Sequence, residues 1–282
     1  MQIIRQTGQV GTLLLALQMM PAQAENTVLM LESGIAATLN LPDGATLAPA
    51  VLMLHGFGSS RDEVAGMYIR EAAALEAQGI ASLRIDFRGF GKSDGDTGST
   101  TIDLQLEDAL QGLEVLAATD GVDPARIGVL GFSLGGGVAM LLAEAKPDMV
   151  KSLVTWSSVG DFDADMRGVI SEAAFARAET DGIVGLDLGW RTIALKNSFF
   201  HSLSGRDLTA SIAAYPGAYL TIAGELDFSA AYGADFVAAA AGSVKEAMIV
   251  PGGDHIFGVF GPDAAMSEGV VTKTAEWFAE TL

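Results

Sequence analysis

Cysteine is absent from this chain of 282 residues, and basic residues are few: 16 lysines and arginines stand against 35 aspartates and glutamates. Without cysteine the chain can form no disulfide framework, carry no thiol nucleophile and accept no lipid on a cysteine. The net charge of −19 argues against nucleic acid and anionic membrane surfaces as partners, because like charges repel. The composition therefore directs attention to small-molecule chemistry.

A run long enough to span a membrane is absent from the start of the chain. The apolar stretch at residues 10–20 is about 11 residues long and is interrupted by two polar residues, whereas a spanning helix needs about 20. Arg5 precedes this stretch, and the small-x-small sequence Ala-Gln-Ala follows it at residues 22–24. This pattern is typical of a secretory signal peptide. We expect residues 1–24 to be removed and the protein to be periplasmic or secreted, with no stable membrane anchor.

Half of the residues are hydrophobic, which is ample for a core. From Thr27 onward, short apolar runs alternate with longer amphipathic ones, a pattern that predicts a parallel sheet with helices on both faces. A hairpin is expected first, around a turn at Ser33 and Gly34. Buried strands are then expected at 50–55, 81–87, 126–131, 151–157, 218–224 and 246–250. The predicted fold class is α/β, with a mostly parallel central sheet.

Helix boundaries can also be predicted. Residues 60–63 (Ser-Arg-Asp-Glu) fit a capping box before a helix that Gly79 ends. Helical spacing of apolar residues predicts further helices at 102–118 and at the C-terminus. Residues 158 to about 215 contain no obvious core strand, so we expect a small helical cap inserted into one domain that spans 25–282.

One serine stands at the junction of a predicted strand and a predicted helix. Ser133 lies in Gly-Phe-Ser-Leu-Gly, a G-x-S-x-G sequence. The simplest interpretation is a small turn residue or an N-cap. In a strand-turn-helix context, however, the glycines allow a sharp turn that exposes the hydroxyl at the carboxyl end of the sheet, beside free N–H groups of the helix. This context favours a nucleophile.

A serine nucleophile needs a base, and the chain has three histidines. His55 ends a strand before the nucleophile and is expected to brace a loop. His201 lies in the expected cap and is interpreted as a core or pocket-lining residue. His255, in a glycine-flexed loop after the last strand, is the best candidate.

The base in turn needs a carboxylate to orient it. Asp227 follows the next-to-last predicted strand, where the loop of His255 can reach it, and is the preferred acid. Glu225 and Asp254 remain as alternatives. The chain order Ser133, Asp227, His255 is the one expected of α/β-hydrolases.

Five segments together carry a resemblance to a known family: LHGFGSS, IDFRGFGKSDG, GFSLGG, GELD and GGDHIF. They resemble the α/β-hydrolase fold family, and within it most closely the feruloyl or cinnamoyl esterases and related small carboxylesterases. The resemblance implies that Ser133 is the nucleophile, His255 the base and Asp227 its partner. It also implies an oxyanion hole made by the backbone N–H groups of Phe57 and Leu134.

The expected activity is therefore hydrolysis of a small ester, of short-chain or hydroxycinnamoyl type, through an acyl-enzyme and without cofactor or metal. A peptidase or amidase of the prolyl-oligopeptidase type, a cofactor-free perhydrolase and a non-catalytic binding module are the alternatives. Four aromatic residues could line an acyl pocket or belong to the core: Trp156, Trp190, Phe199 and Phe200.

The first prediction concerns the mature terminus. Cleavage after Ala24 should give protein from the native host that begins at Glu25, as N-terminal sequencing will read directly. Recovery of an intact Met1 in the membrane fraction would contradict it.

Overall fold

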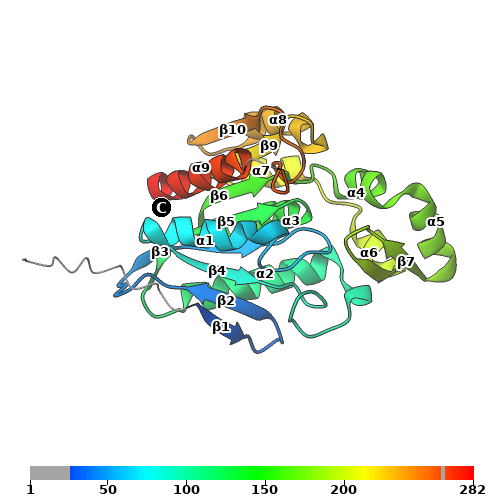
Figure 1. The fold of residues 1–282 in the computed structure, drawn as a ribbon, viewed down its shortest axis with the longest axis horizontal. Helices are drawn as coiled ribbons and strands as arrows, with labels where there is room; N and C mark the ends of the chain where they lie inside the picture. The colour runs from blue at the N-terminus through cyan, green and yellow to red at the C-terminus, as the bar shows by residue number, and fades with distance from the viewer. Residues whose placement is uncertain (1–25, 262–263) are drawn as a thin grey trace, which may run out of the picture.

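The computed structural model describes residues 26–261 and 264–282, and the expected signal peptide lies outside these residues. A twisted sheet of eight strands forms the centre of the described chain (Figure 1). Its strand order is β1-β2-β4-β3-β5-β6-β9-β10. β1 pairs antiparallel with β2 and β2 antiparallel with β4, and every later pair is parallel. The predicted α/β class and the opening hairpin are confirmed.

The strands of the main sheet are β1 Thr27–Met30, β2 Ala36–Asn40, β3 Ala48–Leu54, β4 Ala81–Ile85, β5 Val122–Phe132, β6 Val150–Trp156, β9 Ala218–Gly224 and β10 Lys245–Val250. The helices are α1 Met67–Ala77, α2 Ile102–Ala117, α3 Leu134–Ala145, α4 Phe162–Ile170, α5 Glu172–Asp181, α6 Asn197–Ser202, α7 Leu208–Ala214, α8 Gly233–Ala239 and α9 Ala265–Thr281. Single 3₁₀ turns cover Val64–Gly66, Thr97–Ser99 and Phe228–Ala231.

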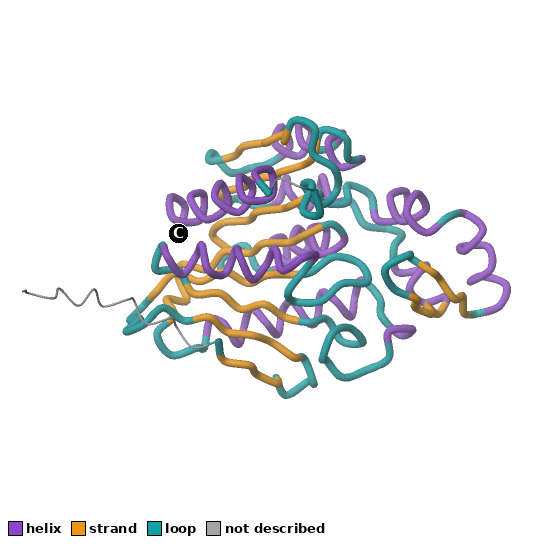
Figure 2. The backbone as a smooth tube through the Cα atoms, in the orientation of Figure 1, coloured by secondary structure: helices purple, strands orange, loops and turns teal. Residues whose placement is uncertain are grey.

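The sheet separates two hydrophobic clusters because successive strand residues point to opposite faces. In β3, Leu52 and Leu54 belong to one cluster, whereas Val51 and Met53 belong to the other. Helices α1 and α9 cover the second cluster, and α2, α3 and α7 cover the first (Figures 1 and 2). Both faces of the central strands are therefore buried, which is why these strands are continuously apolar in sequence.

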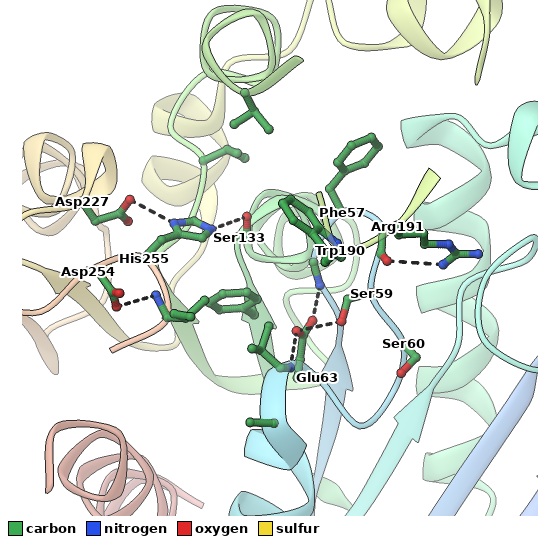
Figure 3. Close-up of a pocket in the computed structure, with 18 of the residues that line it drawn as sticks. Phe57, Ser59, Ser60, Glu63, Ser133, Trp190, Arg191, Asp227, Asp254 and His255 are labelled. Atoms are coloured by element: carbon green, nitrogen blue, oxygen red, sulfur yellow. Dashed lines mark hydrogen bonds and ion pairs between the residues drawn. The ribbon is translucent and has the colours of Figure 1, made fainter. Parts of the chain in front are cut away.

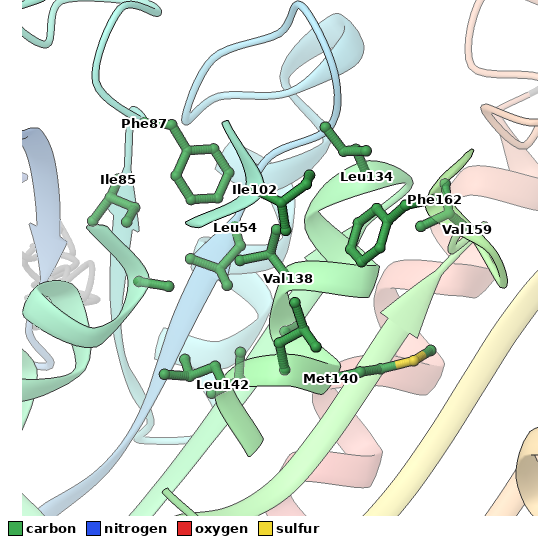
Figure 4. Close-up of a cluster of buried hydrophobic side chains, with 14 of the residues drawn as sticks. Leu54, Ile85, Phe87, Ile102, Leu134, Val138, Met140, Leu142, Val159 and Phe162 are labelled. Atoms are coloured by element: carbon green, nitrogen blue, oxygen red, sulfur yellow. The ribbon is translucent and has the colours of Figure 1, made fainter. Parts of the chain in front are cut away.

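Helix α3 follows the G-x-S-x-G sequence and is apolar on all sides. Val138, Met140 and Leu142 are fully buried. Figure 4 shows this helix enclosed by side chains from several elements, including Leu54 of β3, Ile102 of α2 and the cap residue Phe162. The element that begins at the candidate nucleophile is thus held by packing from all directions.

The segment between β6 and β9 contains α4, α5 and α6, which lie at one end of the sheet, and then α7, which returns to cover the first cluster (Figure 1). It also contains a β-hairpin, β7 Ile183–Asp187 with β8 Thr192–Lys196, which forms a separate two-stranded antiparallel sheet. The expected helical cap therefore also contains a pair of strands that was not predicted. Burial alternates residue by residue in both strands, so each strand has one apolar face. An alternating pattern over five residues is too short to identify a strand from the sequence.

The expected capping box at residues 60–63 is also wrong. Helix α1 begins at Met67, after a 3₁₀ turn, and its N-cap Gly66 provides no side-chain hydrogen bond. The carboxylate of Glu63 accepts instead from the N–H of Gly56, and the contact between Glu63 and Ser60 is a backbone one, with Glu63 N donating to Ser60 O at 2.9 Å. The end of this helix was predicted correctly, since Gly79 follows it with a φ of 74°.

Among residues 26–261 and 264–282, no helix has both the length and the apolar composition needed to cross a membrane.

One carboxyl group is buried without a partner between the sheet and its helices. Glu71 of α1 is 0% exposed, and neither of its carboxyl oxygens has a hydrogen-bond partner in the described chain. Burial raises the pKa of Glu71 well above its usual value, because the charged form is poorly solvated there. The folded protein therefore keeps this group protonated at pH values where the unfolded chain ionises it.

This burial predicts a stability that falls with rising pH. The contribution of Glu71 is fully present below the unfolded pKa, about 4.3, and is lost as pH rises toward the higher folded value. The free energy of unfolding of wild type should fall between pH 5 and pH 8. In Glu71→Gln, which does not titrate, this fall should be smaller by at least about 1 kcal/mol. Urea titrations at both pH values measure this difference, and Glu276→Gln on the exposed side of α9 should behave as wild type. Equal losses in wild type and Glu71→Gln would contradict the assignment.

Candidate active site

Three predicted site residues meet at the carboxyl ends of the parallel strands (Figure 3). Ser133 follows β5, Asp227 follows β9, and His255 lies in the loop after β10. The His255 Nε2 atom is 3.0 Å from Ser133 Oγ, and its Nδ1 atom is 3.0 Å from Asp227 Oδ1. Residues separated by 122 positions in the sequence thus form one continuous hydrogen-bonded chain.

Ser133 occupies a sharp turn between β5 and α3. Its φ of 53° and ψ of −120° are unusual for a residue with a side chain. Both of its peptide groups are fixed: its N–H donates to Trp156 O at 2.9 Å, and its C=O accepts from Gly136 N at 3.0 Å and Val159 N at 3.2 Å. The turn is therefore held by the neighbouring strand and helix, and it presents the hydroxyl to the cavity.

The two glycines of the G-x-S-x-G sequence are required for close approach. A Cβ atom on Gly131 would lie 2.3 Å from Gly135 O, and one on Gly135 would lie 2.3 Å from His55 O. Both contacts are with backbone, which cannot move aside as a flexible side chain can. The missing side chains let α3 begin directly against the end of β3, which explains the motif sterically.

Asp227 is oriented by two hydrogen bonds. One of its carboxylate oxygens is bonded to His255 Nδ1, and the other accepts from Ser229 Oγ. Burial acts to raise the pKa of Asp227, but the hydrogen bonds to His255 and Ser229 outweigh it and lower the pKa. The side chain is only 4% exposed, so a charged carboxylate lies out of water beside the imidazole.

The other two candidate acids are engaged elsewhere. Glu225 is exposed and accepts from the N–H of Gly252 at 2.8 Å. Asp254 accepts from the N–H groups of Ile256 at 3.1 Å and Gly258 at 2.7 Å, and so shapes the turn that carries His255. Of the three carboxylates considered from sequence, only Asp227 is bonded to the histidine.

The two backbone donors implied by the family resemblance also border this site. Leu134 is the first residue of α3, where helical N–H groups have no partner within the helix. Phe57 lies in the loop after β3 and lines the same cavity as Ser133. In the described chain, no acceptor is bonded to the N–H of Phe57 or of Leu134. Both N–H groups are available to an oxygen of a bound molecule.

The remaining histidines have different outcomes. His55 braces a loop as expected: its Nε2 accepts from Phe87 N at 3.0 Å, so its Nδ1 carries the proton and donates to Gly56 O at 2.8 Å. Desolvation lowers the pKa of His55 to about 4, so it is neutral. The expectation for His201 is wrong, because it is exposed and lies 2.8 Å from Glu179. Its apolar neighbours Phe199 and Phe200 take the inward positions of α6.

A cavity of about 1000 Å³ opens at Ser133 and His255. Its walls are mostly apolar or aromatic and come from the β3 loop, the cap and the loop before α9. They include Phe57, Phe132, Val159, Met166, Trp190, Phe228 and Phe260. Of the four aromatic residues considered from sequence, only Trp190 lines it. Trp156 is fully buried, with its Nε1 donating to Thr274 Oγ1 at 2.8 Å, and Phe199 and Phe200 lie in the core of the cap.

Sequence reasoning missed several cavity residues. Phe228 follows Asp227 directly and stacks on the His255 ring, with centroids 5.4 Å apart. Its position after a candidate acid was a usable signal. Phe260 and Glu63 carried no such signal, because only the tertiary arrangement brings their loops to the cavity. The described residues contain no group of three or more histidine, aspartate or glutamate side chains placed to hold a metal ion.

Comparison with known families gives one clear match. The profile of the alpha/beta hydrolase fold matches residues 49–236, which include most of β3, the Ser133 turn and Asp227. The chain belongs to the alpha/beta hydrolase fold family. The resemblance read from the sequence segments is thereby confirmed at the level of the family.

Solved structures agree with this fold. The chain is similar to the esterase Est1E of Butyrivibrio proteoclasticus with bound ferulic acid, at a TM-score of 0.74 and 22% identity over 90% of this chain and 98% of that one. It is also similar to a monoacylglycerol lipase of Paleococcus ferrophilus, at a TM-score of 0.66 and 18% identity over 88% and 99% of the two chains. At these identities the likeness concerns the fold.

Curated relatives match only in part. An uncharacterized 31.7 kDa protein of Escherichia coli is 33% identical over 143 residues, which are 51% of this chain and 49% of that protein. The quorum-quenching protein AidA of Acinetobacter baumannii is 32% identical over 38% of this chain and 34% of its own length. The chain thus spans about half the length, or less, of these curated relatives.

Proposed function

We propose that this protein is a serine hydrolase that cleaves carboxylic esters through an acyl-enzyme intermediate. The observation that carries the proposal is the hydrogen-bonded chain from Ser133 Oγ through His255 to Asp227, at 3.0 Å for each link. A serine hydroxyl is a weak nucleophile until a base accepts its proton, and this geometry supplies that base. Acyl transfer also needs hydrogen-bond donors for the negatively charged oxygen of the tetrahedral intermediate, and the free N–H groups of Phe57 and Leu134 can supply them.

The reaction follows from these contacts. Ser133 Oγ attacks the ester carbonyl carbon while His255 Nε2 takes the hydroxyl proton, which gives a tetrahedral intermediate and an imidazolium. The intermediate collapses, the C–O bond to the alcohol breaks, and His255 returns the proton to the departing oxygen. Water then attacks the acyl group on Ser133 with His255 again as base, releasing the acid and restoring the serine.

Asp227 has two roles in this scheme. As the acceptor of the Nδ1 proton it fixes the tautomer in which Nε2 is free to act as base. Its charge also stabilises the imidazolium formed when Ser133 is deprotonated. The low pKa of Asp227 supports both roles, because the carboxylate remains ionised over the range in which histidine works as a base.

Stabilisation of the oxyanion is assigned to Phe57 and Leu134. Backbone donors fixed before the reaction cost no reorganisation when charge develops, which makes this contribution large. The N-terminus of α3 adds the positive end of a helix dipole at the same point. Ser133 and Phe57 line one cavity, and Leu134 directly follows Ser133 in the chain.

The cavity suggests the substrate class. Its volume of about 1000 Å³ exceeds what an acetyl group needs, and its aromatic walls suit a planar ring. The similar esterase of B. proteoclasticus was solved with ferulic acid. We therefore propose short-chain or hydroxycinnamoyl esters as substrates. From residues 1–24 alone we propose that the enzyme acts in the periplasm or outside the cell.

Variants of the triad test the proposed catalytic residues. Ser133→Ala and His255→Ala should each lower turnover of a chromogenic acetate ester by about 10³-fold or more, and the double variant should lose little more, because these residues act as a unit. Asp227→Asn should also lose most activity, since asparagine can hold the wrong imidazole tautomer. Steady-state kinetics and circular dichroism measure activity and folding together.

The matched controls are the two carboxylates that do not contact His255. Glu225→Gln and Asp254→Asn should lower turnover far less than Asp227→Asn, because Glu225 accepts one backbone N–H and Asp254 accepts two, and the amide oxygen of the variant can still accept them. The assignment fails if Ser133→Ala keeps more than about a tenth of wild-type turnover.

A panel of acyl groups tests the substrate class. Ferulate and short-chain esters should be cleaved faster than long-chain triglycerides, and faster than the matching amides. The acidic surface should disfavour anionic esters, an effect that added salt should weaken. Faster turnover of long-chain lipids at an oil-water interface would refute the proposed class.

A further inference from the structure

A buried carboxylate that the acyl-transfer scheme does not use lies against the loop after β3. Glu63 is 8% exposed and lines the same cavity as Ser133 and His255. Its Oε1 accepts from the N–H of Gly56, and its Oε2 accepts from Ser59 Oγ at 2.9 Å and Val64 N at 3.1 Å. Figure 3 shows this carboxylate pointing into the loop that carries Phe57. Every one of its contacts is made to that loop or to the turn before α1.

These contacts fix the peptide that carries a proposed oxyanion donor. The C=O of Gly56 and the N–H of Phe57 belong to one planar trans peptide, so they point in opposite directions. His55 holds that C=O through its Nδ1 proton at 2.8 Å, and Glu63 holds the N–H of the same glycine. Gly56 is thus bonded at both sides of its Cα, which removes the freedom a glycine would otherwise have. Because the Gly56–Phe57 peptide is held in this way, the direction of the Phe57 N–H is fixed as well.

The backbone at Glu63 supports a special role for this residue. Its φ of 55° with ψ of −178° is a conformation that glycine adopts readily and glutamate rarely does. Ala65, two residues later, is also left-handed, with a φ of 49°. A glycine at position 63 would relieve the backbone strain there but would lose the carboxylate. The chain has glutamate at this position despite the strain.

From this arrangement we propose that Glu63 is a positioning residue, whose carboxylate aims the Phe57 N–H at the developing oxyanion only when it is ionised. The inference rests on the proposed function of Ser133. An ionised carboxylate accepts hydrogen bonds at both oxygens. When protonated, one oxygen becomes a donor, so one of the contacts to Gly56, Ser59 or Val64 is lost or weakened. The loop then holds Phe57 less firmly.

The surroundings make this ionisation relevant near neutral pH. Desolvation raises the pKa of Glu63 to about 7, although the hydrogen bonds from Gly56, Ser59 and Val64 and the charge of His255 act to lower it. The titratable groups that face it are His255, from the loop before α9, and Tyr68 of α1, whose own pKa the charge of Glu63 helps to raise. The buried Glu71 acts on Tyr68 as well.

The pH dependence of kcat/KM tests this inference. A scheme with His255 alone gives an acid limb in which log kcat/KM rises with a slope of one. With Glu63 as a second required base, the slope in wild type should approach two between about pH 5 and pH 6. In Glu63→Gln it should return to one, kcat at pH 8 should fall about a hundredfold, and KM should change less than about twofold, because a displaced oxyanion donor affects the transition state more than binding.

Two further variants complete the experiment. Glu114→Gln, on the exposed side of α2 where its carboxylate lies 3.9 Å from Lys146 Nζ, should keep the wild-type slope and kcat. Ser59→Ala removes a hydrogen bond that lowers the pKa of Glu63, so its acid limb should move to higher pH. This variant decides the question if Glu63→Gln does not fold.

The outcomes separate this inference from the proposed function. A slope of one in wild type, or a Glu63→Gln profile that matches wild type while turnover still depends on Ser133, overturns the positioning role and leaves the esterase standing. An acid limb unmoved in Ser59→Ala also overturns it. Absence of any Ser133-dependent turnover in the wild type overturns both.

Discussion

The turn at Ser133 is the constraint on which the rest of the site depends. A non-glycine residue at a φ of 53° is held there because β5 ends and α3 begins with almost no room between them. The absence of side chains at Gly131 and Gly135 permits this approach, and the fully buried flanks of α3 keep it in place. The strain is therefore supported by the core of the whole domain rather than by the loop itself.

From this turn the remaining parts are arranged by the order of the parallel strands. β9 and β10 end at the same edge of the sheet as β5, so Asp227 and His255 come from consecutive parallel strands and reach Ser133 from one side. The loop after β3 comes from the other side and brings Phe57, and the preceding Gly56 is fixed there because its C=O accepts from His55 and its N–H donates to Glu63. Each proposed catalytic group thus follows or begins an element that is buried in the domain. This favours a site whose groups are in position before the substrate binds.

Much of this arrangement could be predicted from sequence, and the reasons are specific. Buried parallel strands are continuously apolar, so the strands that end at Ser133 and Asp227 were recognisable, and the glycines around Ser133 indicated a sharp turn. Asp227 could be preferred to Glu225 because of its distance from the strand end. The hairpin β7–β8, the exposure of His201 and the contacts of Glu63 were not predictable in this way. The first two depend on which segments meet in space. At residues 60–63 the capping motif gave the wrong answer because the carboxylate of Glu63 bonds to Gly56, Ser59 and Val64 of its own loop instead.

The central claim is that Ser133 becomes covalently acylated, and the most direct measurement is active-site labelling followed by mass spectrometry. A fluorophosphonate reacts with an activated serine, with loss of fluoride, and forms a stable analogue of the tetrahedral intermediate. The account predicts one adduct per chain, mapped to the peptide that contains Ser133, and formed more slowly when His255 is replaced by alanine. An adduct on another serine, or none on Ser133 in the folded wild-type protein, would contradict it.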